Sequence, residues 1–406
     1  MKSWPTPAAV ELPANNRRIS VFDSVSKQLV VTPSDFATLY VCGITPYDAT
    51  HMGHASTYLA FDLLNRAWRD AGVDVKFAEN VTDIDDPLLE RATATKVDWQ
   101  ELAVSEIDLF RSDMTALRII PPDFYISVTE HMNQIIGWIE NLIAKDLAYK
   151  VENDWYFDSR LTDSVVQTMQ GLVEDPLSVF AERGGDPNRA GKRNPFDALL
   201  WRSERAGEPA WPAPFGAGRP GWHIECLAIA KDMLGETITV QGGGSDLLFP
   251  HHFMCELQGQ AATNNKFASS HVHAGLVSYQ GEKMSKSRGN LVFVSKLLAA
   301  GTDPMAIRLA ILRHHYRSEW EWTDELLDQA KADLARWRTA LSGYGTASAT
   351  NLLNQIRDAV ANDLDTPRAL KAVDDFVSST LAGDRSDLNG SGLAARALDR
   401  ILGIAL

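Results

Sequence analysis

Residues 37–54, ATLYVCGITPYDATHMGH, decide the fold of this chain. The apolar run ATLYVC, residues 37–42, ends in a loop with glycine and proline, which is typical of a buried parallel strand. From residue 53 to residue 71 apolar side chains recur at helical spacing, and residues 73–80, VDVKFAEN, alternate as in a strand. Strand, helix and strand within about forty-five residues predict a βαβ unit, the start of a doubly wound α/β sheet.

The composition of the 406 residues is that of an ordinary globular chain, with 45% hydrophobic and 23% charged residues. No run of 18 or more apolar residues occurs, so the sequence predicts no membrane span. The N-terminus, MKSWPTPAAVELPANN, lacks the apolar stretch of a secretory signal. The three cysteines are odd in number and widely spaced, which favours a reducing cytoplasm where thiols serve metals or chemistry rather than disulfides.

The net charge of −14 is weak evidence against nucleic acid, because an acidic chain can still carry a local basic patch. The C-terminal residues 321–406 hold 9 Lys and Arg against 13 Asp and Glu. No basic stripe for nucleic acid is found there.

Two motifs have the chemistry of phosphate binding. HMGH, residues 51–54, follows a strand and opens a helix, where free N–H groups and the helix dipole attract phosphate and where His51 and His54 can donate hydrogen bonds. KMSKS, residues 283–287, puts Lys283 and Lys286 on a serine-rich loop that suits a leaving pyrophosphate. Taken singly, the histidines also fit simple helix capping and the lysines a solvated basic turn.

Two further patterns point to ligands at strand ends. GGGSD, residues 242–246, ends a predicted strand, so a nucleotide can approach closely and Asp246 can accept bonds from ribose hydroxyls; the alternative is an ordinary glycine turn. Cys42, Cys226 and His251 follow separate elements and together would leave one position of a zinc ion open. Spacing alone does not separate this site from buried core cysteines.

Taken together, the motifs resemble a known family. HMGH and KMSKS, in this order and about 230 residues apart, resemble the signature pair of class I aminoacyl-tRNA synthetases. YVCGITPYD, NVTDIDD, GRPGWHIEC, GGGSDLLFPHH and EKMSKS are similar to the cysteinyl-tRNA synthetase branch, from about residue 20 to residue 320. Within it, the opening SWP, CGITPYDATH, the AERGGDP loop and VQGGGSD look more like the mycothiol cysteine ligases. The chain also ends where the synthetase would continue into an anticodon-reading domain.

The resemblance implies a class I synthetase-type Rossmann nucleotide-binding domain with a connective insertion and a C-terminal all-helical region. We predict five parts: residues 1–120 as the first half of the Rossmann catalytic domain with an N-terminal extension, 121–195 as the connective insertion, 196–270 as the second half of the catalytic domain, 271–320 as the stem region that bears KMSKS, and 321–406 as the C-terminal helical domain.

The resemblance also implies an activity and its residues. The ligases activate L-cysteine with ATP and Mg²⁺ and join it to the amine of glucosaminyl-inositol. His51 and His54 would steady the triphosphate, and Lys283 and Lys286 the pyrophosphate. Zn²⁺ would be held by Cys42, Cys226 and His251 with the substrate thiolate as fourth ligand. The cysteinyl-adenylate would be lined by Cys42, Gly43, Ile44, Thr45, Thr57, Asn80, Val81, Thr82, Trp222, Gly244, Ser245, Asp246 and Val277.

The same resemblance implies a cytoplasmic monomer with small-molecule substrates and no nucleic-acid or membrane partner. One departure concerns the zinc site, because the synthetase pattern HHE-x-E reads HHFMC here. Cys255 lies four residues after His251 and would share its helix face. We expect Cys255 to pack as a buried thiol, since a fourth protein ligand would close the position that the substrate needs.

Two loops remain to be assigned. The AERGGDP loop, residues 181–187, is interpreted as part of the sugar–inositol site, although its composition also fits a surface turn. The acidic residues Asp83, Asp85 and Asp86 are expected to cap a helix and to make structural bonds rather than to bind a metal. Two alternatives stay open for the whole chain: a truncated cysteinyl-tRNA synthetase, and a non-catalytic nucleotide-binding paralogue. Both phosphate motifs and all three matched zinc ligands are intact, which speaks against the second.

Overall fold

The computed structural model describes residues 1–161, 163–284 and 289–406. Its centre is a five-stranded parallel sheet in the order β11-β10-β3-β4-β5. These strands are β3 (Phe36–Val41), β4 (Asp74–Val81), β5 (Phe124–Ser127), β10 (Ile238–Gly244) and β11 (Ala268–Ala274). The chain leaves β3 toward β4 and returns on its other side as β10. The strand order therefore reverses between β3 and β10, which is where doubly wound sheets bind ligands, so the predicted fold class is confirmed.

The alternation of side chains along β3 assigns its two faces to different cores. Leu39 and Val41 pack into the core that includes α1 (Met52–Asp70). Tyr40 and Cys42 point the other way, into the core that includes α4 (Met132–Ala144) and α7 (Trp222–Leu234). Successive residues of a strand point to opposite faces, so this single short strand supplies both sides of the future site.

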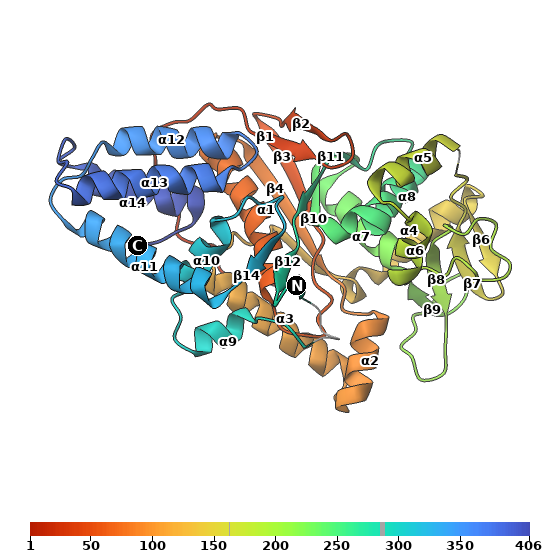
Figure 1. Cartoon of the computed structure of the whole chain (residues 1–406). Coiled ribbons are helices and arrows are strands. Elements are labelled where there is room, and N and C mark those ends of the chain that lie inside the picture. The colour runs from red at the N-terminus through yellow and green to blue at the C-terminus, as the bar shows by residue number, and fades with distance from the viewer. Residues whose placement is uncertain (162, 285–288) are drawn as a thin grey trace.

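The helix α1 starts directly after the opening loop, as predicted. His51 is its N-cap, and the His51 Nδ1 accepts a hydrogen bond from the Gly53 N–H over 3.1 Å. Most of its 19 residues are buried, because the helix passes between the sheet and the C-terminal helices (Figure 1). The chain leaves α1 through Gly72, whose φ of +82° suits glycine.

The connective insertion is built around a four-stranded antiparallel sheet, β6-β7-β8-β9, at the right of Figure 1. Its strands are β6 (Ala148–Val151), β7 (Asp154–Phe157), β8 (Leu199–Ser203) and β9 (Gly218–Pro220). Two helices join β7 to β8: α5 (Asp163–Leu172) and α6 (Pro176–Glu182).

These pairings place the ends of the insertion differently from the predicted boundaries at residues 121 and 195. β5 lies within 121–195, yet it pairs with β4 and completes the parallel sheet. β8 and β9 lie within 196–270, yet β8 pairs with β7. The apolar run DALLW, residues 197–201, is compatible with a parallel and with an antiparallel sheet, so it does not indicate the partner of β8.

The remaining elements frame this core. They are β1 (Ser20–Asp23), β2 (Gln28–Val31), α2 (Asp86–Thr95), α3 (Trp99–Ala116), η1 (Thr129–His131), η2 (Ser245–Leu247), η3 (Leu248–His252), α8 (Phe253–Thr263), β12 (Val277–Tyr279), β13 (Glu282–Lys283), α9 (Val294–Ala299), α10 (Pro304–Leu312), β14 (Trp320–Trp322), α11 (Asp324–Ser342), α12 (Ala349–Ala361), α13 (Thr366–Leu381) and α14 (Gly390–Leu402).

The C-terminal part is helical from α10 onward apart from β14, which the sequence did not predict. β14 pairs in parallel with β12, so the stem contributes a small three-stranded sheet. Helices α11 to α14 form the bundle at the left of Figure 1. Asp365 caps α13 and a proline follows in its first turn, a combination that favours the start of a helix.

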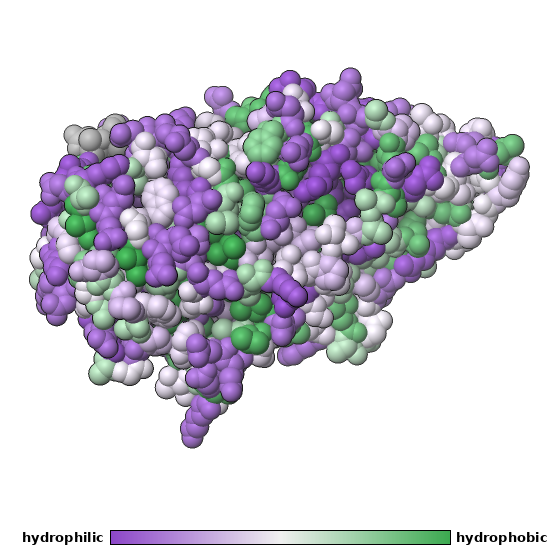
Figure 2. Space-filling view, turned by 180° about the vertical axis from the view of Figure 1, so that it is seen from behind, coloured by the Kyte–Doolittle hydropathy of each residue, from purple (hydrophilic) through white to green (hydrophobic). Residues whose placement is uncertain are grey.

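Figure 2 shows the face opposite to that of Figure 1, where hydrophilic residues surround small, separate hydrophobic groups. None of the helices in the described part of the chain is long and apolar enough to cross a membrane.

Candidate active site

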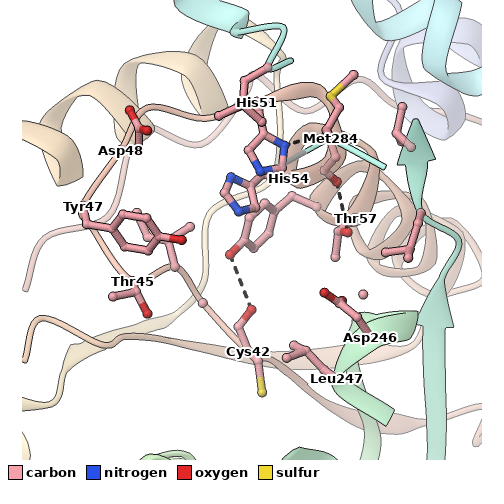
Figure 3. A pocket seen from close by; sticks show the side chains of 18 of the residues that line it. Cys42, Thr45, Tyr47, Asp48, His51, His54, Thr57, Asp246, Leu247 and Met284 are labelled. Carbon is pink, nitrogen blue, oxygen red and sulfur yellow. Dashed lines mark hydrogen bonds between the residues drawn. The ribbon is translucent and has the colours of Figure 1, made fainter. Parts of the chain in front are cut away.

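A cavity of about 400 Å³ lies at the carboxyl ends of β3 and β10, where the strand order reverses. Its walls come from the loop after β3, the start of α1, the end of β10 and the stem (Figure 3). The lining residues are Cys42, Gly43, Ile44, Thr45, Tyr47, Asp48, His51, Gly53, His54, Thr57, Tyr58, Arg183, Trp222, Gly244, Asp246, Leu247, Gly275, Leu276, Val277, Met284 and Leu291.

Most of the sequence-predicted site residues meet in this cavity. Those that line it are Cys42, Gly43, Ile44, Thr45, His51, His54, Thr57, Trp222, Gly244, Asp246 and Val277. Asn80, Val81, Thr82 and Ser245 are not among the lining residues, and Cys226 and His251 lie behind the wall that Cys42 forms. Lys286 falls outside the described residues, and of Lys283 only the backbone, in β13, is described.

Asn80 is buried beneath the cavity floor and holds the opening loop in place. Its Oδ1 accepts hydrogen bonds from the Gly43 N–H and the Tyr40 hydroxyl, each over 2.9 Å. Its amide donates to the Thr82 hydroxyl over 3.1 Å. A Cβ on Gly43 would lie 1.6 Å from the Asn80 carbonyl oxygen, so this close approach requires glycine. Asn80 therefore shapes the site from below.

The two histidines of HMGH stand side by side at the N-terminus of α1. Their rings stack with centroids 3.8 Å apart. Because the His51 Nδ1 accepts the Gly53 N–H, the proton of this ring is on Nε2. Burial lowers the pKa of His54 to about 4, so its imidazole is also neutral at pH 7. Both rings thus offer neutral N–H donors beside the positive end of a 19-residue helix, a suitable place for phosphate.

The segment that follows KMSKS is bonded to the residues that precede HMGH. The Met52 N–H donates to the Val292 carbonyl over 2.9 Å, and the Val294 N–H donates to the Thr50 carbonyl over 3.0 Å. Between them, His51 and Phe293 form an antiparallel bridge. The segment 292–294 is therefore anchored through its backbone to the start of α1, about 240 residues earlier in the sequence.

Within the described residues, one group of side chains is placed to hold a metal ion: Cys42, Cys226 and His251, whose ligand atoms lie within 4.8 Å of one another. All three residues are buried. The Cys42 thiol donates to the Cys226 sulfur over 4.0 Å. This bond, with His251 nearby, holds the pKa of Cys226 well below its usual range, while burial raises the pKa of Cys42.

The donor set fits zinc. The Nε2 atom of His251 is buried and makes no hydrogen bond in the described structure. Its Nδ1 lies 3.0 Å from the Nδ1 of His223. Burial lowers the pKa of His223 well below its usual range, so this ring stays neutral and can accept the His251 Nδ1–H. Two thiols and an Nε2 whose ring is oriented by a second hydrogen bond are typical of a zinc site.

Cys255 makes a different contact. Its thiol donates to the His223 carbonyl over 3.4 Å, and it is not a member of the group with Cys42, Cys226 and His251. The residue is fully buried at the start of α8. Its geometry is that of a packed thiol.

A pair of histidines near Cys42 was not predicted from the sequence. The His252 Nε2 lies 3.2 Å from the Cys42 sulfur, and the His252 Nδ1 lies 2.8 Å from the His273 Nε2. Burial lowers the pKa of both imidazoles, so both rings are neutral: the His252 Nε2–H can donate to the sulfur while its Nδ1 accepts the Nε2–H of His273. The available signal was HVH, residues 271–273, whose two histidines share one face of β11.

The contact of Arg183 with Asp246 and the packing role of Gly242 were not predicted from the sequence. Arg183, just after α6, lines the cavity and pairs with the Asp246 carboxylate over 3.3 Å. A Cβ on Gly242 would lie 2.3 Å from the Phe61 ring, so this glycine lets α1 pack closely on β10. Gly244 lines the cavity itself, as expected for a residue that admits a ligand.

The acidic run NVTDIDD is structural, as the sequence predicts. Asp85 caps α2 by accepting the Asp86 N–H over 2.8 Å. Asp83 accepts the Thr129 N–H over 2.9 Å, and Asp86 pairs with Arg202 over 3.0 Å.

Comparison with known proteins agrees with this geometry. Residues 29–332 match the family model of the tRNA synthetases class I (C) catalytic domain. The L-cysteine:1D-myo-inositol 2-amino-2-deoxy-alpha-D-glucopyranoside ligase of Acidothermus cellulolyticus is 53% identical over 407 residues, and the enzyme of the same name from Renibacterium salmoninarum is 54% identical over 424 residues. Both alignments cover 100% of this chain and of the relative.

Among solved structures, the methionyl-tRNA synthetase of Mycobacterium tuberculosis in complex with methionyl-adenylate superposes with a TM-score of 0.67 at 17% identity. The superposition covers 91% of this chain and 92% of that one. At this identity the likeness shows the shared fold alone.

Proposed function

Because the chain belongs to the family of L-cysteine:1D-myo-inositol 2-amino-2-deoxy-alpha-D-glucopyranoside ligases, which carry the class I (C) synthetase catalytic domain, we propose that it joins L-cysteine to the amine of glucosaminyl-inositol at the expense of ATP. One observation carries the proposal: the loop after β3 brings the phosphate-binding end of α1 and the thiol–imidazole group to a single cavity. Such a cavity suits a substrate with a thiol at one end and a reacting carboxylate at the other.

In the first half-reaction, the carboxylate oxygen of cysteine attacks the α-phosphorus of ATP in line. The new bond gives the cysteinyl-adenylate, and the bond to the bridging oxygen breaks to release pyrophosphate. His51 and His54 donate N–H groups to the phosphate oxygens, and the N-terminus of α1 adds its dipole. We assign the pyrophosphate contacts to Lys283 and Lys286, and Mg²⁺ enters with ATP. The chain's work here is positioning and charge stabilisation.

Cys42, Cys226 and His251 would hold zinc at the cavity wall, with Cys42 lining the cavity and the other two behind it. Zinc bound there supplies a soft coordination position that prefers a thiolate to a hydroxyl. The neutral rings of His223 and His252 orient His251 and Cys42. This arrangement supports selection of cysteine over serine.

In the second half-reaction, the sugar amine attacks the carbonyl carbon of the mixed anhydride. The bond from that carbon to the phosphate oxygen breaks, AMP leaves, and the amine loses one proton. Gly43, Thr45, Thr57, Trp222 and Asp246 would hold the adenylate during this step.

We further propose that the enzyme acts as a cytoplasmic monomer on small molecules. The three cysteines are unpaired and buried, which suits a reducing compartment. The negative charge of residues 321–406 speaks against a tRNA-binding face there.

The test compares acceptors. The full-length protein is loaded with zinc and supplied with ATP, Mg²⁺ and cysteine, and pyrophosphate exchange is measured with serine as the matched control. AMP release is then followed after adding either glucosaminyl-inositol or a cysteine-accepting tRNA. We expect pyrophosphate exchange with cysteine and not with serine. We expect AMP release once glucosaminyl-inositol is added. Release coupled only to tRNA would favour the synthetase, and no exchange at all would favour a non-catalytic paralogue.

A further inference from the structure

The AERGGDP loop of the insertion sends one side chain into the cavity. Arg183 lines the cavity, and its guanidinium lies 3.3 Å from the Asp246 carboxylate, which follows β10. Arg183 is the only arginine or lysine among the described lining residues. Figure 3 shows Asp246 on the side of Thr57 and Leu247, apart from His51. The insertion and the nucleotide-binding sheet therefore meet at one charged pair.

Aromatic packing fixes the position from which Arg183 reaches the cavity. Phe180 of α6 is 1% exposed, and its ring lies 5.6 Å from Phe196. Phe196 in turn lies 6.3 Å from Phe249, two residues before the predicted zinc ligand His251. A Cβ on Gly185 would lie 2.4 Å from the Phe180 ring, so the chain turns tightly beneath it. Arg183 thus follows a helix whose aromatic packing extends to the segment that holds His251.

The other cations of the segment 183–195, which includes most of the AERGGDP loop, are paired elsewhere. Arg189 pairs with Asp154 over 2.7 Å, and Lys192 pairs with Asp186 over 3.0 Å. Arg193 pairs with Asp158 over 2.7 Å. These contacts lie within the insertion, and none of the three cations lines the cavity. Arg183 is therefore the single described cation of this segment that lines the cavity.

The Arg183 guanidinium has the chemistry of a polyol contact. It supplies several N–H donors in a fixed plane, which match the oxygen atoms of neighbouring hydroxyls, and the Asp246 carboxylate holds it in place. The pair carries no net charge, which suits an uncharged polyol better than a polyphosphate. Its side chains are 33% and 25% exposed, and ion pairs this open contribute little stability. An entering ligand can therefore compete for these bonds at small cost.

We propose that Arg183 is a specificity-determining residue that binds the hydroxyl groups of the acceptor, while Asp246, which we assign to the adenylate, orients its guanidinium. The inference rests on the proposed function, which supplies an acceptor made of a sugar and a cyclitol. Arg183 acts on binding of the acceptor and takes no part in the transfer of protons or of the cysteinyl group.

The experiment separates the two half-reactions in the full-length zinc-loaded protein. Arg183→Ala and Arg183→Lys are compared with wild type, and Arg193→Ala removes another guanidinium of the segment 183–195 as a matched control. The KM values for ATP and cysteine come from pyrophosphate exchange, and the KM for glucosaminyl-inositol comes from ligation. We expect Arg183→Ala to raise the acceptor KM by about tenfold to a hundredfold, the effect of losing a charge-assisted hydrogen bond. The acceptor KM of Arg183→Lys should fall between the values of wild type and Arg183→Ala. The acceptor KM of Arg193→Ala should match that of wild type.

The outcomes distinguish the inference from the function on which it rests. An unchanged acceptor KM in Arg183→Ala would overturn the inference while ligation by wild type still stood. An equal loss in exchange and ligation would assign Arg183 to ATP and overturn it as well. Failure of wild type to ligate glucosaminyl-inositol would overturn the proposed function itself. Retained exchange in Arg183→Ala shows that the variant is folded.

Discussion

The sulfur atoms of Cys42 and Cys226 lie 4.0 Å apart, although 184 residues separate them in the sequence. Cys42 directly follows the central strand, on the face that α7 covers, and Cys226 lies in the first turns of that helix. His251 enters from the segment after β10 and completes the group. Three elements therefore meet at one buried point, which no local spacing encodes.

The zinc site gives the first prediction. We expect Cys42→Ser and Cys226→Ser to lose most of the bound zinc, because each removes one of three protein ligands. Cys255→Ala should keep zinc near the wild-type content, since the Cys255 thiol contacts the His223 carbonyl. Metal analysis of the purified proteins, with cobalt absorption as an independent readout, decides the matter. Equal zinc loss in Cys255→Ala and Cys226→Ser would make Cys255 a ligand.

His54 gives the second prediction. Its neutral imidazole stands at the N-terminus of α1, where N–H donors face the phosphates of the proposed ATP site. Removing one such donor from a transition state commonly lowers kcat by about 10² to 10³. We expect a loss of this size in pyrophosphate exchange for His54→Ala and a smaller one for His54→Asn, which keeps an N–H donor.

The control for His54 is His315→Asn, because His315 lies outside the cavity. Since the pKa of His54 is about 4, its own titration should leave no step in the rate between pH 6 and pH 8. A change of less than threefold in kcat for His54→Ala would contradict the assignment.

Arg308 gives a prediction about stability. Its fully buried guanidinium pairs with Asp62 and donates to the carbonyls of Leu402 over 2.6 Å and of Leu117 over 2.8 Å. These bonds join α10, α1, α14 and the residue that follows α3. Removing one partner of a buried pair costs about 3 to 5 kcal/mol, so Arg308→Met should lower the free energy of unfolding by that amount.

Urea unfolding measures this change. Lys371→Ala is the control, because the pair of Lys371 with Asp375 is exposed and its loss should cost less than about 0.5 kcal/mol. Equal unfolding free energies for the two variants would show that the Arg308 contacts contribute nothing net.

Asp113 gives a prediction about pH. Burial raises its pKa from the usual 3.8 to about 7, partly offset by the Thr50 hydroxyl. Between these two pH values the folded state binds the proton more tightly than the unfolded state, so this group's stabilising contribution falls as pH rises and is lost above pH 7. Asp113→Asn cannot ionise, and we expect it to exceed wild type in stability by about 1 to 3 kcal/mol at pH 8.

The check is the difference in unfolding free energy between Asp113→Asn and wild type as a function of pH. It should grow from pH 4 to pH 7 and then stay constant. A difference that does not change with pH would show that Asp113 titrates normally in the folded protein.

Local patterns in the sequence were enough to predict several helices and strands. The helix that opens at HMGH and the strand that ends in GGGSD follow from apolar period and turn chemistry, which depend on neighbours in the chain. The family resemblance is confirmed by relatives that match over the full length. The partners of β8 and β14 were not predictable, because the pairing of a strand depends on distant segments.

Periodicity and turn chemistry are local, so the nucleotide-binding sheet and the phosphate motifs at its strand ends could be predicted from the residues alone. The division of roles between Cys42 and His54 depends on tertiary contacts. Alternation along β3 turns the Cys42 side chain to the α7 side, beside Cys226 and His251, while α1 holds His51 and His54 at another part of the same cavity wall. The tertiary structure also brought Arg183 of the insertion to Asp246, since aromatic packing between distant segments, not spacing, sets that contact.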